Sequence, residues 1–174
     1  MNNILIIENE RLRQNCNLVN IFDKRYDSLI EEMKHILISK EAYGIAASQL
    51  GVMEQIILVN DEIYFNPKIK KMYGVQFYYE SCISIPNTIG LVRRPYLIEI
   101  EAQDKDGNYI HKIIEDFDAI TFCHEYDHLN GILFIDRAIE VIDADVTLMN
   151  KIRKQNPRKV INKDKKFVYE KRNC

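Results

Sequence analysis

Tryptophan is missing from this sequence of 174 residues, and glycine and proline are scarce, at 6 and 4 residues. This scarcity excludes collagen-like and Gly/Pro-rich low-complexity chains, and no Gly/Ser-rich stretch marks a linker. No apolar run approaches the roughly 20 residues of a membrane-spanning helix, so we expect no membrane contact. The apolar patch near the N-terminus lacks a basic start and meets Glu8 and Glu10 at once, which argues against a signal peptide. A cytoplasmic location is therefore expected.

Cysteine is also too sparse for a disulfide framework. The four cysteines form no C-x-x-C pair, so a zinc ribbon is not indicated either: Cys16, Cys82, Cys123 and Cys174. At least one of them is expected to be a free thiol with a function.

Charge is unevenly distributed along the chain. Residues 1–149 carry 14 Lys and Arg against 24 Asp and Glu, whereas residues 150–174 carry 10 against 2. The length suits one domain that buries about 70% of the surface of its unfolded chain. We expect a single catalytic domain over residues 1–150 and a basic tail over residues 151–174. Deletion of residues 155–174 is expected to leave the hydrolysis of a short substrate nearly unchanged.

Hydrophobic periodicity predicts an α+β fold. Five apolar residues between Tyr26 and Lys40 recur at helical spacing and predict an amphipathic helix: Leu29, Ile30, Met33, Ile36 and Leu37. The segments "QIILVN", "EIYFNP" and "GVQFYYESCISI" predict strands, and alternating runs on both sides of Asp106-Gly107 predict a hairpin. A second amphipathic helix is expected over residues 138–152. Antiparallel sheets should thus pack around a central helix.

That central helix is predicted from "DFDAITFCHEYDHLNG", with Asp116 or Asp118 as N-cap and Gly131 just after its C-terminus. Apolar residues surround most of it, so it should be buried. It carries His124, Glu125 and His128 in the pattern H-E-x-x-H, which places both imidazoles on one face. Two surface histidines are the plain alternative, but buried imidazoles and a carboxylate need partners, which a metal ion supplies.

The residues alone leave the third metal ligand open. The extended pattern H-E-x-x-H-x-x-G-x-x-H fails, because Phe134 stands at its last position. Glu140 on a second helix would make the protein a zinc metallopeptidase. Cys82, at the end of a predicted strand, would offer a soft thiolate ligand.

Three segments resemble the signature motifs of bacterial peptide deformylases, G-φ-G-φ-A-A-x-Q, E-G-C-L-S and Q-H-E-φ-D-H-L. They are "AYGIAASQ" at 42–49, "ESCIS" at 80–84 and "CHEYDHL" at 123–129, in the family's order. Three ordered motifs are far more specific than H-E-x-x-H alone. The resemblance implies a metal-dependent amidohydrolase that removes the N-formyl group from the initiator methionine of new polypeptides and releases formate.

The resemblance also assigns roles. It implies Cys82, His124 and His128 as metal ligands and Glu125 as the general base that takes a proton from the attacking water. The other implied residues are the oxyanion donors Gln49 (side chain) and Ile83 (backbone), the peptide-binding Gly44 and Ile45, and the methionine-pocket residues Ile120 and Thr121. Cys/His₂ ligation suits Zn²⁺, whereas the family implies oxygen-sensitive Fe²⁺.

Four residues depart from the family motifs: Ala42 and Ser81, where glycine is expected, Ser48 for proline and Cys123 for glutamine. Ser81 would line the substrate cleft, and a Cβ there would cost on the order of 1 kcal/mol if the backbone needed positive φ. A deformylase-like domain that binds without turnover is therefore a further alternative. The family also suggests that the basic tail contacts the ribosome, against the alternative of a solvated appendage.

Overall fold

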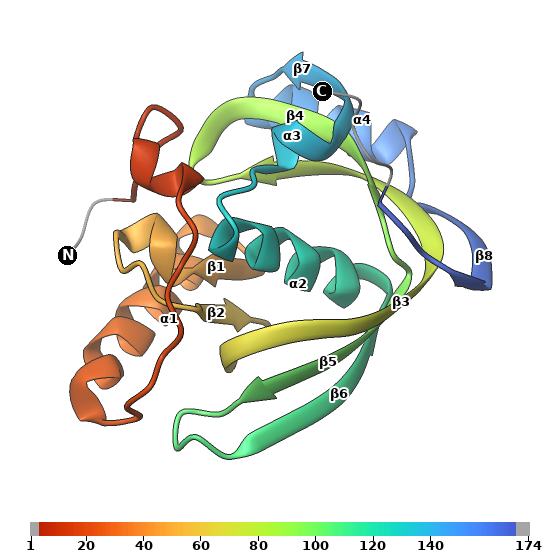
Figure 1. Ribbon diagram of the computed structural model, residues 1–174. Coiled ribbons are helices and arrows are strands. Elements are labelled where there is room, and N and C mark those ends of the chain that lie inside the picture. Colours follow the sequence, from red (N-terminus) through yellow and green to blue (C-terminus); the bar gives the residue numbers. More distant parts are fainter. Residues whose placement is uncertain (1–3, 170–174) are drawn as a thin grey trace.

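One antiparallel sheet of eight strands forms the body of the protein in the computed structural model, which describes residues 4–169 (Figure 1). The strands are β1 Gly44–Ala46, β2 Ile56–Val59, β3 Glu62–Cys82, β4 Ile85–Arg94, β5 Leu97–Gln103, β6 Tyr109–Glu115, β7 Ala138–Asp143 and β8 Lys159–Lys166. The helices are α1 Asp27–Lys40, α2 Asp116–Leu129, α3 Phe134–Arg137 and α4 Val146–Gln155. The α+β class and the antiparallel sheet agree with the sequence analysis.

Strand β3 organises the sheet because its 21 residues pair with four other strands. It pairs with β2 near its start, then with β5, then with β8 and finally with β4, and register shifts occur within its pairings with β5, β8 and β4. Such shifts bend a strand and increase its twist. In Figure 1 the strand curves past α2, which lies in the middle of the molecule.

Helix α1 forms where the apolar spacing predicted it. Its buried side chains are Ile30, Met33, Ile36 and Leu37, which pack with residues of β1 and β2. The helix ends at Lys40 and is followed by the C-cap residue Glu41, whose backbone is left-handed with φ 50°. This helix therefore covers the strands that lie beside the candidate site.

Helix α2 is surrounded by protein, and nine of its 14 residues are buried. The predicted caps Asp116 and Asp118 are wrong, because the N-cap is Glu115 in an extended conformation without a side-chain bond. Strand β6 leads directly into the helix, and Asp118 instead accepts a hydrogen bond from Asn60 at 2.7 Å. Gly131, which was predicted to follow the C-terminus of the helix, does so with φ 66°. An added Cβ there would collide with the carbonyl oxygen of Arg13.

The predicted helix over residues 138–152 is wrong in its first half. Residues 138–143 form β7, which pairs with β4, and α4 begins only at Val146. Asp145 sets that start, because its side chain accepts a hydrogen bond from the backbone N–H of Leu148 at 2.8 Å. The apolar residues of both segments fit one helical stripe in the sequence, but the free edge of β4 supplies backbone partners for a strand.

The basic C-terminal segment is built into the sheet up to the last described residues. Strand β8 pairs with β3, Phe167 is buried, and Tyr169 lies 3.2 Å from the guanidinium of Arg94. The expectation that residues 155–174 are dispensable for hydrolysis therefore conflicts with these contacts. Cys174 and the other residues of 170–174 lie outside the described part.

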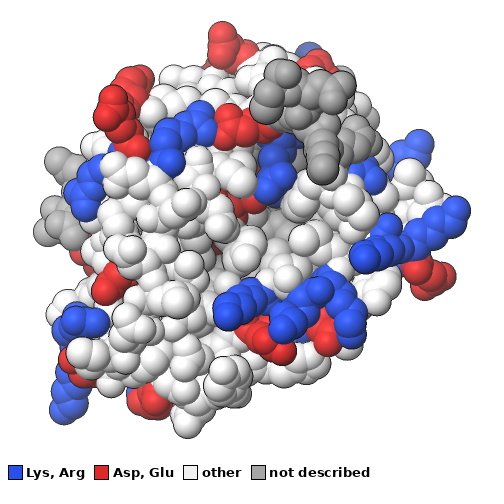
Figure 2. Space-filling model, in the orientation of Figure 1, with Lys and Arg blue, Asp and Glu red and all other residues white. Residues whose placement is uncertain are grey.

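Charged side chains of both signs are interspersed on the face in Figure 2, with uncharged surface between them. Ion pairs join neighbouring strands β3 and β5, such as Lys70 with Glu101 and Lys71 with Glu99. Of the helices within residues 4–169, none combines the length and apolar character needed to cross a membrane.

Candidate metal centre

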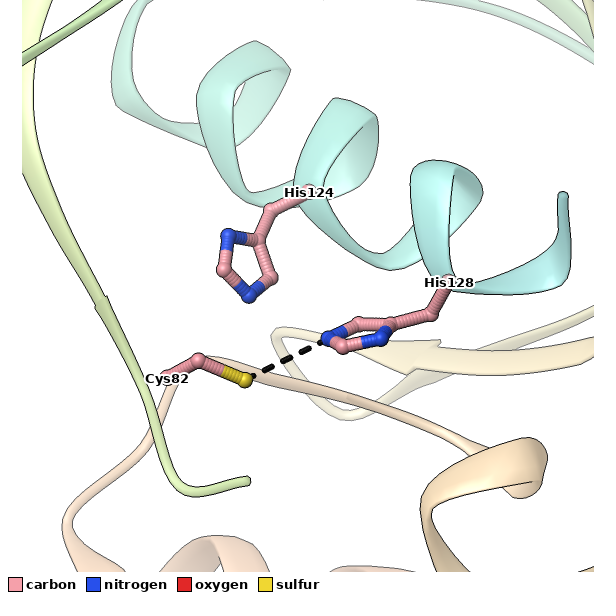
Figure 3. Close-up of side chains that lie close together, drawn as sticks. All are labelled: Cys82, His124 and His128. Carbon is pink, nitrogen blue, oxygen red and sulfur yellow. Dashed lines mark hydrogen bonds between the residues drawn. The ribbon is translucent and has the colours of Figure 1, made fainter. Parts of the chain in front are cut away.

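Cys82, His124 and His128 meet where the end of β3 faces α2 (Figure 3). One ligand atom from each lies within 4.8 Å of the other two, and Cys82 Sγ is 3.3 Å from His128 Nε2. The two histidines are four residues apart, so one helical turn brings their rings to the same face of α2. A thiolate and two imidazoles are a ligand set typical of a transition-metal site.

A buried ion-pair network contacts the Nδ1 side of the His124 ring. Its Nδ1 lies 2.9 Å from Glu80 Oε2, and Glu80 binds Arg94, which is fully buried and also binds Asp127. Burial alone would raise the pKa of Glu80, but the charge and hydrogen bonds of Arg94 lower it to about 2. Glu80 is therefore ionised and fixes the ring so that Nε2 remains for the cluster.

The two imidazoles of the cluster favour different protonation states. Burial opposes protonation of His124, yet hydrogen bonds to Cys82 and Glu80 hold its pKa well above the ordinary value. His128 differs, since burial and the charge of His124 hold its pKa well below the ordinary value. His128 is therefore neutral and keeps a ring lone pair for a metal ion, whereas at His124 a metal ion would take the place of the proton that Cys82 and Glu80 favour.

Glu125 follows His124 on α2 and is 4% exposed. Burial is the main cause that raises the pKa of Glu125 to about 7. Its Oε2 has no hydrogen-bond partner among the described residues, while its Oε1 side lies against β1, where a Cβ on Gly44 would be 2.7 Å from Oε1. A buried carboxylate with this pKa is suited to accept and return a proton near neutral pH.

Gln49 is fixed beside Cys82 by three contacts. Its Oε1 accepts from the Ala46 N–H at 2.9 Å, and its Nε2 donates to Ser84 Oγ at 3.0 Å and to Cys82 Sγ at 3.5 Å. These contacts aim the amide donor toward the cluster. A donor held in this way needs little reorganisation to stabilise negative charge nearby.

A cavity of about 190 Å³ opens onto the cluster. Most of the expected site residues line it: Gly44, Gln49, Ser81, Cys82, Ile83, Ile120, Thr121, His124 and Glu125. The side chain of Ile45 is buried and does not belong to this lining, and His128 lies deeper, at 1% exposure. Strand β1 is at the end of the strand order and pairs on one side with β2.

The remaining alternatives and departures also have clear positions. Glu140 is on strand β7 and not on a helix, and its carboxylate accepts from the Tyr79 hydroxyl at 3.2 Å, outside the cluster. Cys123 is buried in the core cluster on another face of α2. Neither Ala42 nor Ser81 is among the described residues with positive φ, so neither position demands glycine for its backbone.

Sequence analysis missed several residues that support the site. Asp127, inside the motif, binds both Arg94 and Arg137, and an acidic residue in the middle of a buried helix was a signal for such pairing. Ser84, two residues after Cys82, binds Gln49. Arg153 lines the cavity but stands in a basic stretch, where the sequence gives it no distinction.

The polypeptide deformylase family model matches residues 1–143. A peptide deformylase of Acetivibrio thermocellus is 34% identical over 160 residues, which cover 90% of this chain and 93% of the relative. Peptide deformylase 2 of Clostridium acetobutylicum is 38% identical over 144 residues, covering 80% and 96%. The crystal structure of the Thermotoga maritima peptide deformylase superposes with a TM-score of 0.77 at 28% identity, covering 80% of this chain and 99% of that one.

Proposed function

Because the chain belongs to the peptide deformylase family, we propose that Cys82, His124 and His128 hold one divalent metal ion as its reaction centre. Members of this family are metal-dependent hydrolases that remove N-formyl groups. The reaction is hydrolysis of the formyl group on the N-terminal formyl-methionine of newly made polypeptides, with release of formate. The observation that carries the proposed centre is the approach of three ligand atoms to within 4.8 Å beside the buried Glu125.

The donor set fits a divalent transition metal. His124 Nδ1 is engaged by Glu80, and His128 Nε2 faces Cys82, so each ring presents one nitrogen to the common centre. When bound, the ion supplies a Lewis acid that makes a water molecule more acidic and polarises the formyl oxygen. We propose Fe²⁺ as the native ion, because the family resemblance favours it over Zn²⁺, and the soft thiolate of Cys82 is compatible with both.

Glu125 is the proposed general base. Its Oε2 takes a proton as water attacks the formyl carbon, and the carboxyl group then gives a proton to the departing amine nitrogen. The raised pKa of about 7 supports both steps, because the group can exist in either protonation state near neutral pH.

Gln49 and Ile83 are the proposed donors to the oxyanion. The Gln49 amide is oriented by Ala46 and Ser84, and the N–H that contacts Cys82 Sγ at 3.5 Å is the one that would turn to the negative oxygen. The backbone N–H of Ile83, directly after Cys82, would be the second donor. Removal of one such donor typically reduces turnover by about 10² to 10³-fold.

The peptide is proposed to bind as an added strand. Because β1 lies at the end of the strand order, its backbone at Gly44 and Ile45 is a suitable partner for an extended substrate. The methionine side chain would enter the cavity between Ile120 and Thr121. All of these groups lie within the single domain proposed for residues 1–150.

Formate release tests this function. Anaerobically purified protein is incubated with formyl-Met-Ala-Ser, formate is quantified, and new amino termini are followed in the same sample. We expect formate without internal cleavage, and metal analysis of the same preparation should give iron. Internal cleavage would support the peptidase alternative, and binding without either product would support a non-catalytic domain.

We further propose a cytoplasmic protein that meets its substrate at the ribosome. Six exposed lysines on α4 and β8 supply positive charge: Lys151, Lys154, Lys159, Lys163, Lys165 and Lys166. Such charge attracts the phosphates of ribosomal RNA, and the attraction weakens as salt increases. The end of the tail, residues 170–174, lies outside the described part.

Substitution is a better test than truncation, because β8 is paired with β3. Replacing Lys159, Lys163 and Lys165 with glutamine should weaken ribosome co-sedimentation and reduce its salt dependence, while hydrolysis of a short peptide is unchanged. The matched control replaces Lys24, Lys68 and Lys105. Equal ribosome affinity of both variants and the parent protein at low salt would contradict the contact.

A further inference from the structure

Arg153 reaches from α4 to the rim of the candidate cleft. Its Nε donates to the carbonyl oxygen of Tyr79 at 3.0 Å, and its Nη2 donates to Ser81 Oγ at 2.7 Å. Both acceptors lie on β3 immediately before Cys82. The guanidinium is therefore held at a defined place in the lining of the cavity.

The charge of Arg153 is not neutralised by a carboxylate within residues 4–169. The other arginines near the site differ, since Arg94 binds Glu80 and Asp127, and Arg158 binds Asp116 at 2.7 Å. Two donors of the Arg153 guanidinium are used by β3, and no contact within the described residues engages its Nη1. A planar group with remaining donors is well suited to bind a carboxylate.

The other charged residues of the cavity lining do not cancel the positive charge of Arg153. Lys40 also lines the cavity and is exposed, whereas Glu41 is the exposed acidic group of the lining. The other two acidic residues of the lining are buried: Glu80, which pairs with Arg94, and Glu125 beside the metal ligands. The aromatic ring of Tyr78 lies 5.7 Å from Arg153 Cζ and covers one side of the guanidinium.

Ser81 and Arg153 both lie outside what the family motifs account for. Ser81 occupies a motif position where the family resemblance expects glycine, which has no side chain to accept a hydrogen bond. Arg153 lies beyond residues 1–143, which the family model matches. The departure at position 81 thus supplies the acceptor that fixes the arginine at the cleft.

We propose that Arg153, oriented by Ser81, binds a substrate carboxylate located in the residues that follow the formyl-methionine. The protein would then prefer formyl-peptides with Asp or Glu near their start. This preference rests on the proposed deformylase function. Arg153 acts here as a specificity-determining residue, because it contacts the part of the substrate that does not react.

Two pairs of isosteric substrates test this preference. The first pair is formyl-Met-Ala-Glu-amide and formyl-Met-Ala-Gln-amide, and the second is formyl-Met-Glu-Ala-amide and formyl-Met-Gln-Ala-amide. For the metal-loaded protein we expect kcat/KM for the Glu peptide to exceed that for the Gln peptide by about five- to tenfold in at least one pair. The difference should reside mainly in KM and should shrink as the salt concentration rises.

Arg153→Gln should bring this ratio to about one, mainly through a higher KM for the Glu peptide. Arg153→Lys keeps the charge and should retain part of the preference. Arg158→Gln is the matched control, because Arg158 is already paired with Asp116, and it should keep the parent ratio. Thermal unfolding verifies that the variants are folded.

The outcomes separate the two proposals. Hydrolysis of both peptides with a ratio of one in the parent protein, or an unchanged ratio in folded Arg153→Gln and Arg153→Lys, overturns the carboxylate subsite alone. Absence of formate from every formyl-peptide overturns the deformylase function and the subsite together.

Discussion

Glu125 combines a buried carboxylate with a pKa raised to about 7, and both properties come from the protein packed around it. We expect Glu125→Gln to retain the metal but to lose about 10²-fold or more of its turnover, because the amide keeps the shape and cannot accept the proton. Formate release and metal content, measured on one preparation, test this.

Asp118→Asn is the control for a charge change on the same helix, since Asp118 lies in the first turn of α2 and binds Asn60 away from the ligands. It should remain active. Parent-level turnover in Glu125→Gln would remove Glu125 from the mechanism and leave its burial as a purely structural fact.

Gly44 permits the close approach of β1 to the base. A Cβ at this position would lie 2.7 Å from Glu125 Oε1 and 2.8 Å from Thr121 Cγ2. We expect Gly44→Ala to lower kcat/KM by at least about tenfold, because Glu125 must shift to avoid the methyl group and misplaced catalytic groups lose efficiency steeply. Steady-state kinetics at full metal occupancy provide the measurement.

Ala42→Gly is the counterpart of that change, two residues earlier in the same motif. Ala42 has no positive φ, and its N–H is bonded to the carbonyl oxygen of Leu37 at 2.9 Å. Restoring the family's glycine there should change kcat/KM by less than about twofold. A large loss in Ala42→Gly, or none in Gly44→Ala, would show that the approach of β1 to Glu125 is not what requires glycine.

The sequence identified individual site residues better than their surroundings. Motif spacing placed two histidines on one helical face, and the family resemblance selected Cys82 over Glu140. The network of Glu80, Arg94 and Asp127 could not be assembled from the sequence, because it forms only where β3, β4 and α2 meet in space. Arg153 could not be recognised, since its contact with Ser81 joins residues 72 positions apart.

At the scale of elements, the C-terminal segment is held by one buried aromatic side chain. Phe167 is 3% exposed, and its N–H donates to the carbonyl oxygen of Met72 at 2.8 Å. We expect Phe167→Ala to lower the free energy of unfolding by about 3 kcal/mol, because it removes a large apolar group from a closed environment. Denaturant titration of the parent and the variant measures this loss.

Val168→Ala provides the neighbouring control, because Val168 is 64% exposed. Its unfolding free energy should stay within about 0.5 kcal/mol of the parent value. Similar small losses in both variants would mean that β8 and the following residues contribute little to the stability of the sheet.

Local sequence patterns predicted the helices and turns that are determined by residues close together in the sequence. The helices over 27–40 and 116–129 and the hairpin around Asp106-Gly107 follow from spacing and turn chemistry. Strands β7 and β8 follow instead from pairing with β4 and β3. Lysine-rich β8 has little intrinsic strand preference, so its structure depends on a partner far away in the sequence.

At the scale of the whole molecule, the candidate metal centre joins two parts of the chain that otherwise meet through packing. Cys82 ends the long strand β3, whereas both histidines belong to α2. A metal ion held by all three would bind the folded chain and not the unfolded one. Its binding free energy would therefore add to the stability of the entire fold.

Chelation should consequently lower the melting temperature. At a free metal concentration 100 times the dissociation constant, binding contributes about 2.7 kcal/mol, which corresponds to about 5–10 °C for a chain of this size. Cys82→Ser should abolish most of this shift, because a hydroxyl is a far weaker ligand for a soft ion than a thiolate. Glu140→Gln should keep the parent shift, since Glu140 lies outside the cluster and binds Tyr79. Anaerobic differential scanning calorimetry with and without chelator provides the measurement. If chelation lowers the melting temperature of Cys82→Ser as much as that of the parent protein, and no longer lowers that of Glu140→Gln, the third ligand is Glu140.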